Sequence, residues 1–389
     1  IVAPAAVTQP KPPGMPGAGD RPVADRPAAE RSTHVGAEVV DREEAAAVVE
    51  DRHQPAADLA SQSAPGGHLV DACKRCEGSL GHGVGSAEIC GNEPATIEPM
   101  IPRRPRMLAL DVDGTVLTSG HEISNATASA IQRASAAGIE VVLATGRRYR
   151  DVLPVAGALE LTGPLVTASG ALIKEPLAHS TLFRGDFPAG LLELVLGMVD
   201  AAGHEAVVYT DSFAEGFDFH CRGLDVGTAG LREYLARNSH LARVEPRLHE
   251  RPPAAAFAAF SMGSEKAMRA LEAGLRENFE ARLSLHVIRS PRYGDWLCEI
   301  APAGVTKWTG IERLARERGI DPGGICAVGD DANDLPMIRA AGLGVAMGNG
   351  TREVQEAADL VAGGNDEDGL AALLEELLAL PPDEPVAAP

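Results

Sequence analysis

Residues 107–117 read Met-Leu-Ala-Leu-Asp-Val-Asp-Gly-Thr-Val-Leu, a short apolar run that stops at two aspartates, a glycine and a threonine. The apolar run predicts a buried strand, and the polar residues predict its end. Asp111 would then lie at the carboxyl end of the strand, where open α/β sheets bind their ligands. Asp113 is close enough in sequence to serve the same reacting atom, and Gly114 permits a sharp turn. A solvated turn would also explain this cluster if it stood alone, so the rest of the chain has to decide.

Strands and helices alternate on either side of a long central segment. Strands are expected at 139–144, 164–168, 324–329, 343–346 and 359–361, and helices at 124–137, 148–159, 304–318 and 366–379. Alternation of this kind predicts a parallel sheet with helical crossovers, an α/β fold of the Rossmann-like type.

The central segment has a different pattern. Its expected helices lie at 188–202, 225–239 and 264–280, and its expected strands at 205–210, 255–262 and 283–290. This is the pattern of a complete α+β unit inserted between two halves of the first sheet. The sequence therefore predicts a tail at 1–102, a core at 103–177 and 300–380, an inserted cap domain at 178–299 and a loose C-terminus at 381–389.

The composition excludes several classes of protein. Acidic residues outnumber basic ones by 55 to 35 in 389 residues, for a formal charge of −20. That balance argues against a surface for nucleic acid or an anionic membrane, both of which need clustered Lys and Arg. The sequence contains no run of eighteen apolar residues, so no membrane helix is expected. The N-terminal residues do not resemble a secretory signal. Six scattered cysteines fit a reducing cytoplasm better than a disulfide scaffold, so we expect a cytoplasmic protein.

The tail is rich in Pro, Ala, Gly and charged residues and has no lasting hydrophobic period, which predicts disorder. Within it, Cys73 and Cys76 form one tight pair, with Cys90, His68 and His82 nearby. Structural zinc sites usually join two such pairs, so this set is incomplete as a zinc site.

Polar residues recur wherever an expected strand ends or an expected helix begins in the core. They are Asp111 and Asp113, the run Thr145-Gly146-Arg147, Lys307, and the run from Asp330 to Asp334. Several carboxylates in one crevice repel one another unless a cation lies among them. Mg²⁺ suits such an oxygen-rich site and bridges to phosphate. Lys307 adds a positive charge, and Thr145 with neighbouring amides can hold phosphate oxygens. The residues predict a phosphoryl-transfer site with its own carboxylate nucleophile.

These segments resemble the four motifs of the haloacid dehalogenase (HAD) superfamily. The resemblance covers about residues 105–380, and the cap between the second and third motifs is similar to the type IIB (Cof-like) branch. The motifs are Asp111-Val-Asp-Gly-Thr115, Thr145, Lys307 and Gly329-Asp-Asp-Ala-Asn-Asp334. Two positions depart from the usual pattern of that branch: Ser169 stands where Asn is usual, and Trp308 where Gly is usual.

The resemblance also implies a role for each residue. It makes Asp111 the nucleophile and Asp113 the general acid and base. It assigns Mg²⁺ to the Asp111 side chain, the Asp113 backbone carbonyl and Asp330, with Asp334 as a ligand or a partner of the ligands. Thr145 and Lys307 would bind the transferring phosphoryl group. From their positions in the sequence, Gly146 and Arg147 are expected to face the phosphate or substrate, and Asn333 would equally touch the substrate, orient Lys307 or brace its loop. Asp331 is expected to cap a helix or to support the metal ligands, rather than to contact the metal itself.

The expected function is a Mg²⁺-dependent phosphatase that hydrolyses a small phosphorylated metabolite, such as a sugar phosphate, through an aspartyl-phosphate. A phosphomutase, which returns the phosphoryl group to a sugar, is the enzymatic alternative. A receiver-like protein phosphorylated on one Asp as a signal is the non-enzymatic alternative, and it has no use for Asp113 as an acid or for a large cap. The sequence identifies neither the substrate nor the oligomeric state.

Overall fold

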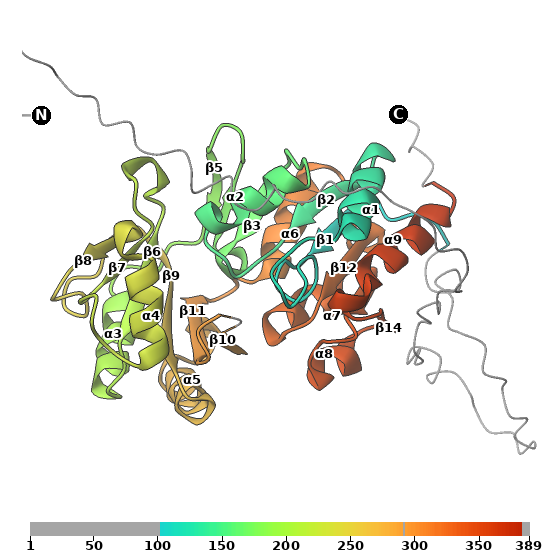
Figure 1. Cartoon of the computed structure of the whole chain (residues 1–389). Helices are drawn as coiled ribbons and strands as arrows, with labels where there is room; N and C mark the ends of the chain where they lie inside the picture. The colour runs from blue at the N-terminus through green and yellow to red at the C-terminus, as the bar shows by residue number, and fades with distance from the viewer. Residues whose placement is uncertain (1–101, 291, 383–389) are drawn as a thin grey trace, which may run out of the picture. The chain divides into compact units, whose positions relative to one another are not determined.

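The structure is a computed structural model that describes residues 102–290 and 292–382 (Figure 1). The predicted disordered tail lies outside the described residues except for residue 102. The incomplete zinc set around Cys73 and Cys76 lies outside them too, as do residues 383–389 of the C-terminus predicted to be loose.

A five-stranded parallel sheet has β1 next to its centre. The strands run in the order β14-β13-β12-β1-β2 and are all parallel. Their bounds are β1 (Met107–Leu110), β2 (Glu140–Leu143), β12 (Ile325–Gly329), β13 (Leu343–Ala346) and β14 (Leu360–Val361). This order brings the ends of β1, β2 and β12 together at one edge, as the alternation of strands and helices predicted.

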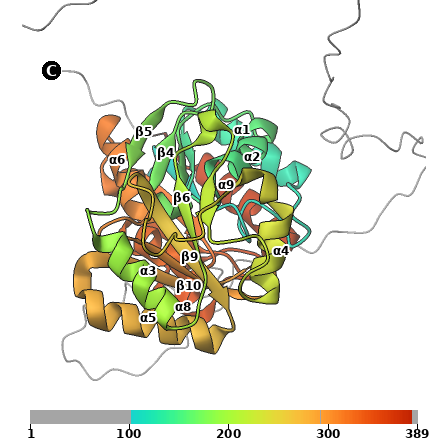
Figure 2. The same cartoon turned by 90° about the vertical axis from the view of Figure 1, so that its left-hand side faces the viewer.

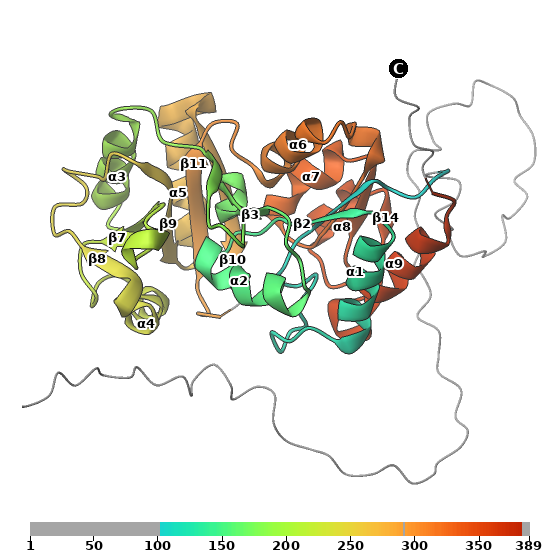
Figure 3. The same ribbon diagram turned by 90° about the horizontal axis from the view of Figure 1, so that it is seen from above.

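Helices cover both faces of this sheet. On one face lie α1 (Asn125–Ala136), α2 (Tyr149–Ala158) and α9 (Gly369–Ala379), and on the other lie α6 (Lys307–Glu317), α7 (Leu335–Ala340) and α8 (Arg352–Ala357). Figure 3 shows α6 and α7 on the side of the sheet opposite to α1 and α9. Successive β1 residues alternate between the two cores, with Leu108 facing α1 and Ala109 facing α6. Because both faces are covered, the strand is apolar at every position.

The expected strand at 164–168 is not a full member of the parallel sheet, and this prediction was wrong in part. The strand β3 (Leu165–Thr167) pairs antiparallel with β4 (Leu172–Lys174), which pairs with β5 (Thr181–Arg184). An isolated parallel bridge between Ala144 and Val166 is its link to the end of β2. The chain reverses at once through the 3-10 turn η2 (Ala168–Gly170), so β3 has too few residues to extend the sheet.

A second sheet contains six strands in the order β10-β11-β9-β6-β7-β8. Their bounds are β6 (Ala206–Thr210), β7 (Phe219–Cys221), β8 (Ala242–Val244), β9 (Ala256–Gly263), β10 (Leu283–Arg289) and β11 (Trp296–Pro302). On one face pack α3 (Leu191–Ala201) and α5 (Glu265–Phe279), and on the other packs α4 (Ala229–Arg237). Figures 2 and 3 show these two sides.

Apart from the last residues of β11, this sheet and its helices fall within the predicted cap segment, and β6, β9, β10 and the three helices lie where the sequence predicted them. The boundaries at 178 and 299 stay a prediction, and β11 runs from Trp296 to Pro302 across the second of them. The remaining short 3-10 helices are η3 (Phe213–Glu215), η4 (Ser239–Leu241), η5 (Glu280–Arg282), η6 (Pro322–Gly324), η7 (Ala332–Asp334) and η8 (Asn365–Glu367). Within residues 102–290 and 292–382, no helix has the length and apolarity to cross a membrane.

Candidate active site

Asp111 is buried at the carboxyl end of β1, where its amide donates to the carbonyl of Val328 over 3.0 Å. The loop that follows passes close to the end of β12. Gly114 has a φ of +78°, and a Cβ there would lie 2.3 Å from an Asp330 carboxylate oxygen. The Thr115 hydroxyl donates to the other Asp330 oxygen over 3.1 Å. Only glycine lets the loop pass this carboxylate. The sequence Asp113-Gly114-Thr115 therefore sets the distance between Asp111 and Asp330.

Three carboxylates meet at this edge of the sheet. Oxygen atoms of Asp111, Asp330 and Asp334 lie within 4.8 Å of one another, the one such group of acidic, His or Cys ligands among the described residues. Burial, together with the charges of Asp334 and Asp113, raises the pKa of Asp111 to about 7 against the opposing charge and hydrogen bond of Lys307. Burial and the charges of Asp111 and Asp334 raise the pKa of Asp330 to about 9. These hard oxygen donors, which repel each other without a cation, fit a divalent metal ion.

Lys307 lies between two of these carboxylates. Its side chain is 1% exposed, and Nζ donates to Oδ1 of Asp111 over 2.6 Å and to Oδ1 of Asp334 over 2.7 Å. Burial lowers the pKa of Lys307, but the two carboxylates outweigh this and hold the pKa above its usual value. A capping box between Thr306 and Thr309 starts α6 at Lys307, and this fixes where the lysine leaves the backbone.

Asp334 also organises the loop that follows β12. Its Oδ2 accepts from the amides of Asp330 and Asp331 over 3.0 and 3.1 Å. Asp331 accepts from the amide of Ala332 over 2.7 Å at the start of η7, so its predicted capping role is confirmed. Asp334 thus ties Lys307 to the loop that carries Asp330.

Asp113 lies apart from the three-carboxylate group. Arg147 binds it with both arms of the guanidinium, Nε to Oδ2 over 2.7 Å and Nη2 to Oδ1 over 2.6 Å. Burial raises the pKa of Asp113, but the hydrogen bonds and charge of Arg147 outweigh it and hold the pKa below its usual value. Arg147 was predicted to face the substrate, and in this structure it occupies the predicted general acid.

Thr145 is buried just beyond β2, and its Oγ1 accepts from the amide of Arg147 over 3.1 Å. Asn333 is buried on η7, and its side-chain nitrogen lies 3.4 Å from the Ser169 hydroxyl. Of the three roles weighed for Asn333, bracing of the loop fits this contact. A Cβ on Gly146 would lie 2.9 Å from Oε1 of Glu299, so the turn after β2 lies directly against that glutamate.

Glu299 and Ser169 were not predicted as site residues. Ser169 has a φ of 54° and ψ of 34°, and its hydroxyl donates to Oε2 of Glu299 over 2.8 Å. Burial raises the pKa of Glu299, against a hydrogen bond from Ser169, the charge of Lys307 and a hydrogen bond from Asn333. Glu299 is the sole charged residue in the strand Trp-Leu-Cys-Glu-Ile-Ala-Pro of β11. A charge in so apolar a strand was the sequence signal that would have identified it.

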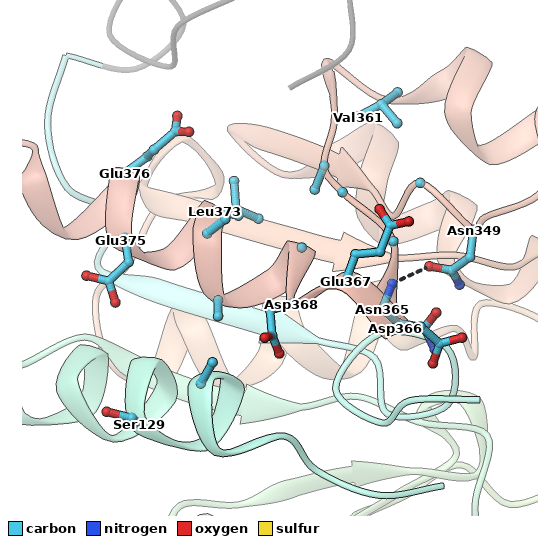
Figure 4. A pocket seen from close by; sticks show the side chains of 18 of the residues that line it. Ser129, Asn349, Val361, Asn365, Asp366, Glu367, Asp368, Leu373, Glu375 and Glu376 are labelled. Atoms are coloured by element: carbon cyan, nitrogen blue, oxygen red, sulfur yellow. Dashed lines mark hydrogen bonds between the residues drawn. The ribbon is translucent and has the colours of Figure 1, made fainter. Parts of the chain in front are cut away.

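A cavity of about 840 Å³ lies elsewhere, between α1, α9 and the loops after β13 and β14 (Figure 4). Asp366, Glu367, Asp368, Glu375 and Glu376 make its lining acidic, and none of the predicted site residues lines it. Its size does not make it the catalytic site, because the carboxylates and the buried lysine lie outside it.

Comparison with known proteins identifies the family. A family model described as haloacid dehalogenase-like hydrolase matches residues 108–374. The chain therefore belongs to the haloacid dehalogenase-like hydrolases, a family of enzymes whose phosphatases use a divalent metal ion.

Individual relatives are phosphatases. A Bacillus subtilis protein named 5-amino-6-(5-phospho-D-ribitylamino)uracil phosphatase is 29% identical over 290 residues, covering 71% of this chain and 99% of that protein. An HMP-PP phosphatase from Serratia proteamaculans is 30% identical over 251 residues, covering 63% and 84%. The solved structure of a HAD subclass IIB sugar phosphatase covers 69% of this chain and 98% of its own, with a TM-score of 0.57 and 19% identity, a likeness of fold alone. The predicted α/β core with an inserted cap, and the resemblance to type IIB, are confirmed.

Proposed function

We propose that this chain is a Mg²⁺-dependent phosphatase that hydrolyses a small phosphorylated metabolite through a phosphorylated Asp111. The observation that carries the proposal is the meeting of Asp111, Asp330 and Asp334 within 4.8 Å, with Lys307 bound to two of them. A buried nucleophile, a metal-binding carboxylate set and a fixed cation are what phosphoryl transfer needs. The two curated relatives described above are named phosphatases of small phosphorylated molecules.

In the proposed first half-reaction, an oxygen of Asp111 forms a bond to phosphorus as the bond to the leaving oxygen breaks. The leaving oxygen keeps the electron pair and takes a proton from Asp113. In the second half-reaction, water attacks the same phosphorus and gives a proton to Asp113, and the Asp111 carboxylate is released with inorganic phosphate. Thr145 and Gly146 would hold phosphoryl oxygens, and Lys307 would offset their charge.

Mg²⁺ would be held by Asp111 and Asp330, with Asp334 as a ligand or as the residue that orients them. Oxygen donors favour this ion over metals that prefer sulfur or nitrogen. When bound, the ion would neutralise charge on the phosphoryl oxygens. The backbone carbonyl of Asp113 is the further ligand that the family resemblance implies.

The first test is steady hydrolysis of p-nitrophenyl phosphate with Mg²⁺ by the full chain. We expect many turnovers with wild type and release of inorganic phosphate, and a single phosphorylation without turnover would contradict the proposal and favour the receiver-like alternative. Product analysis with a hexose phosphate separates hydrolysis from the mutase reaction. The proposal also places the reaction in the cytoplasm, where the buried free thiols of Cys221, Cys298 and Cys326 would stay reduced.

A further inference from the structure

The second sheet leaves part of one face uncovered by its own helices. Along β10, Leu283, Leu285 and Val287 are buried with α3 and α5, whereas the alternate residues Ser284 and His286 are only half-buried. On β11, Glu299 pairs directly with His286, so the two side chains point to the same face. On that face α4 packs over Phe260 and Met262, and the His286–Glu299 pair lies beyond this cover.

The part of the sheet face that carries His286 and Glu299 lies against the proposed phosphoryl site. Oε1 of Glu299 would meet a Cβ of Gly146 at 2.9 Å, and Oε2 accepts from Ser169 over 2.8 Å. The Ser169 amide in turn donates to the carbonyl of Thr145 over 3.0 Å. Glu299 is therefore held on the turn proposed to bind the phosphoryl group, although it belongs to the other sheet.

The contacts of Glu299 are unusual for a purely structural residue. Ser169 adopts a left-handed backbone, which is costly for a residue with a side chain and recurs at functional sites. A half-buried carboxylate beside a phosphate site also repels the negatively charged substrate, which is unfavourable unless the carboxylate makes a contact that the substrate needs. His286 adds no compensating cation, because burial lowers its pKa to about 4, helped by the charges of Lys307 and Arg276.

We propose that Glu299 is a specificity-determining residue that accepts hydrogen bonds from hydroxyl groups of the leaving group. The substrate class is then a hydroxylated phosphate monoester, such as a polyol or sugar phosphate, and esters with a second anionic group near the phosphate are rejected. A carboxylate can accept about four hydrogen bonds, so the hydrogen bonds from Ser169 and Asn333 leave capacity for the substrate. This inference rests on the proposed phosphatase function and narrows its substrate.

The test compares two substrates that differ in one group, glycerol 3-phosphate with a hydroxymethyl and 3-phosphoglycerate with a carboxylate. For wild type we expect kcat/KM to favour glycerol 3-phosphate by about tenfold or more, the scale of discrimination by paired against unpaired polar groups. Glu299→Gln keeps the shape and removes the charge, and we expect it to bring the ratio of the two kcat/KM values to about one. Ser169→Ala removes the hydrogen bond that holds the Glu299 carboxylate in place. We expect it also to lower the ratio, by about threefold.

The matched control is Glu205→Gln, which neutralises another carboxylate of the second sheet's domain. Glu205 pairs with Arg222 and takes no part in the proposed site, so its ratio should equal that of wild type. An unchanged ratio in folded Glu299→Gln, or an equal loss for both substrates, would overturn the specificity role. In either case wild-type hydrolysis of p-nitrophenyl phosphate would still support the phosphatase proposal. Failure of wild type on all three esters would overturn the function itself, and this inference with it.

Discussion

Replacing Lys307 by methionine tests whether the lysine is the counterion of the site. The lysine is 1% exposed and bonds to Asp111 and Asp334, which are 7% and 1% exposed in their side chains. Removing one partner of a buried ion pair leaves an uncompensated charge and costs about 3–5 kcal/mol. For a folded region of this size, each kcal/mol lowers the melting temperature by about 2–4 °C, so we expect a fall of about 10 °C in metal-free buffer.

Mg²⁺ should restore much of the stability that Lys307→Met loses. Without the lysine, the net charge of the three-carboxylate group is more negative, so the group binds a cation more tightly. A ligand at a hundred times its dissociation constant stabilises the folded state by about 2.7 kcal/mol. Turnover should not return, because the proposed contact of Lys307 with the phosphoryl group is lost, and we expect kcat to stay about a hundredfold or more below wild type.

The assay is thermal unfolding with and without Mg²⁺, beside kinetics with p-nitrophenyl phosphate. Lys174→Met is the matched control. Lys174 is 6% exposed and pairs with Asp211 over 2.6 Å, away from the three carboxylates, so its variant should also be destabilised but should gain no more from Mg²⁺ than wild type does. A Lys307→Met protein as stable as wild type without metal, or one that Mg²⁺ does not rescue, would refute the counterion role.

Four further predictions follow from the same geometry. Asp111→Asn should lower kcat by at least about a hundredfold while thermal unfolding shows the fold retained, and residual activity above that level would exclude Asp111 as nucleophile. Arg147→Gln should move the acidic limb of the kcat–pH profile to higher pH, because the pKa of Asp113 is no longer held down; an unmoved limb would remove Asp113 as the base of the second half-reaction. The metal-free protein should lose stability as pH rises from about 5 to 9 in thermal scans, because a carboxyl whose folded pKa is raised, as that of Asp330 is to about 9, favours folding while protonated. Mg²⁺ binding should accordingly release protons, measured by calorimetry in buffers of different ionisation enthalpy, and equal heats in all buffers would contradict this.

The parts of the fold that could be predicted from sequence are those with a strong local pattern. The strand before Asp111 is apolar because it is buried on both faces, and its end is marked by polar residues at once. The strands β7 and β8 have three residues each, too few to establish a period of two. The hairpin of β4 and β5 carries exposed Leu177 and Leu182, so its alternation does not separate a buried from a solvated face.

The candidate site likewise contains residues that the sequence could predict and contacts that it could not. The motif residues could be found because each follows a strand or begins a helix, and parallel topology brings those ends together. The contacts that join distant segments could not be found. Ser169 and Glu299 are 130 residues apart and meet only because β11 crosses from one sheet toward the other. The Asp113–Arg147 pair depends on side-chain reach across two loops, which spacing in the sequence does not encode.

The Asp113–Arg147 ion pair determines which proton transfer Asp113 can carry out in this structure. An ionised Asp113 bound by both arms of Arg147 can accept a proton but cannot donate one, so the proposed acid has to part from the arginine before the leaving group departs. A substrate phosphoryl group lowers the free-energy cost of separating Arg147 from Asp113, because it offers Arg147 the same bidentate geometry that a carboxylate does. On this reasoning the substrate supplies the partner that frees Asp113, and the acid is protonated only when there is an ester bond to break.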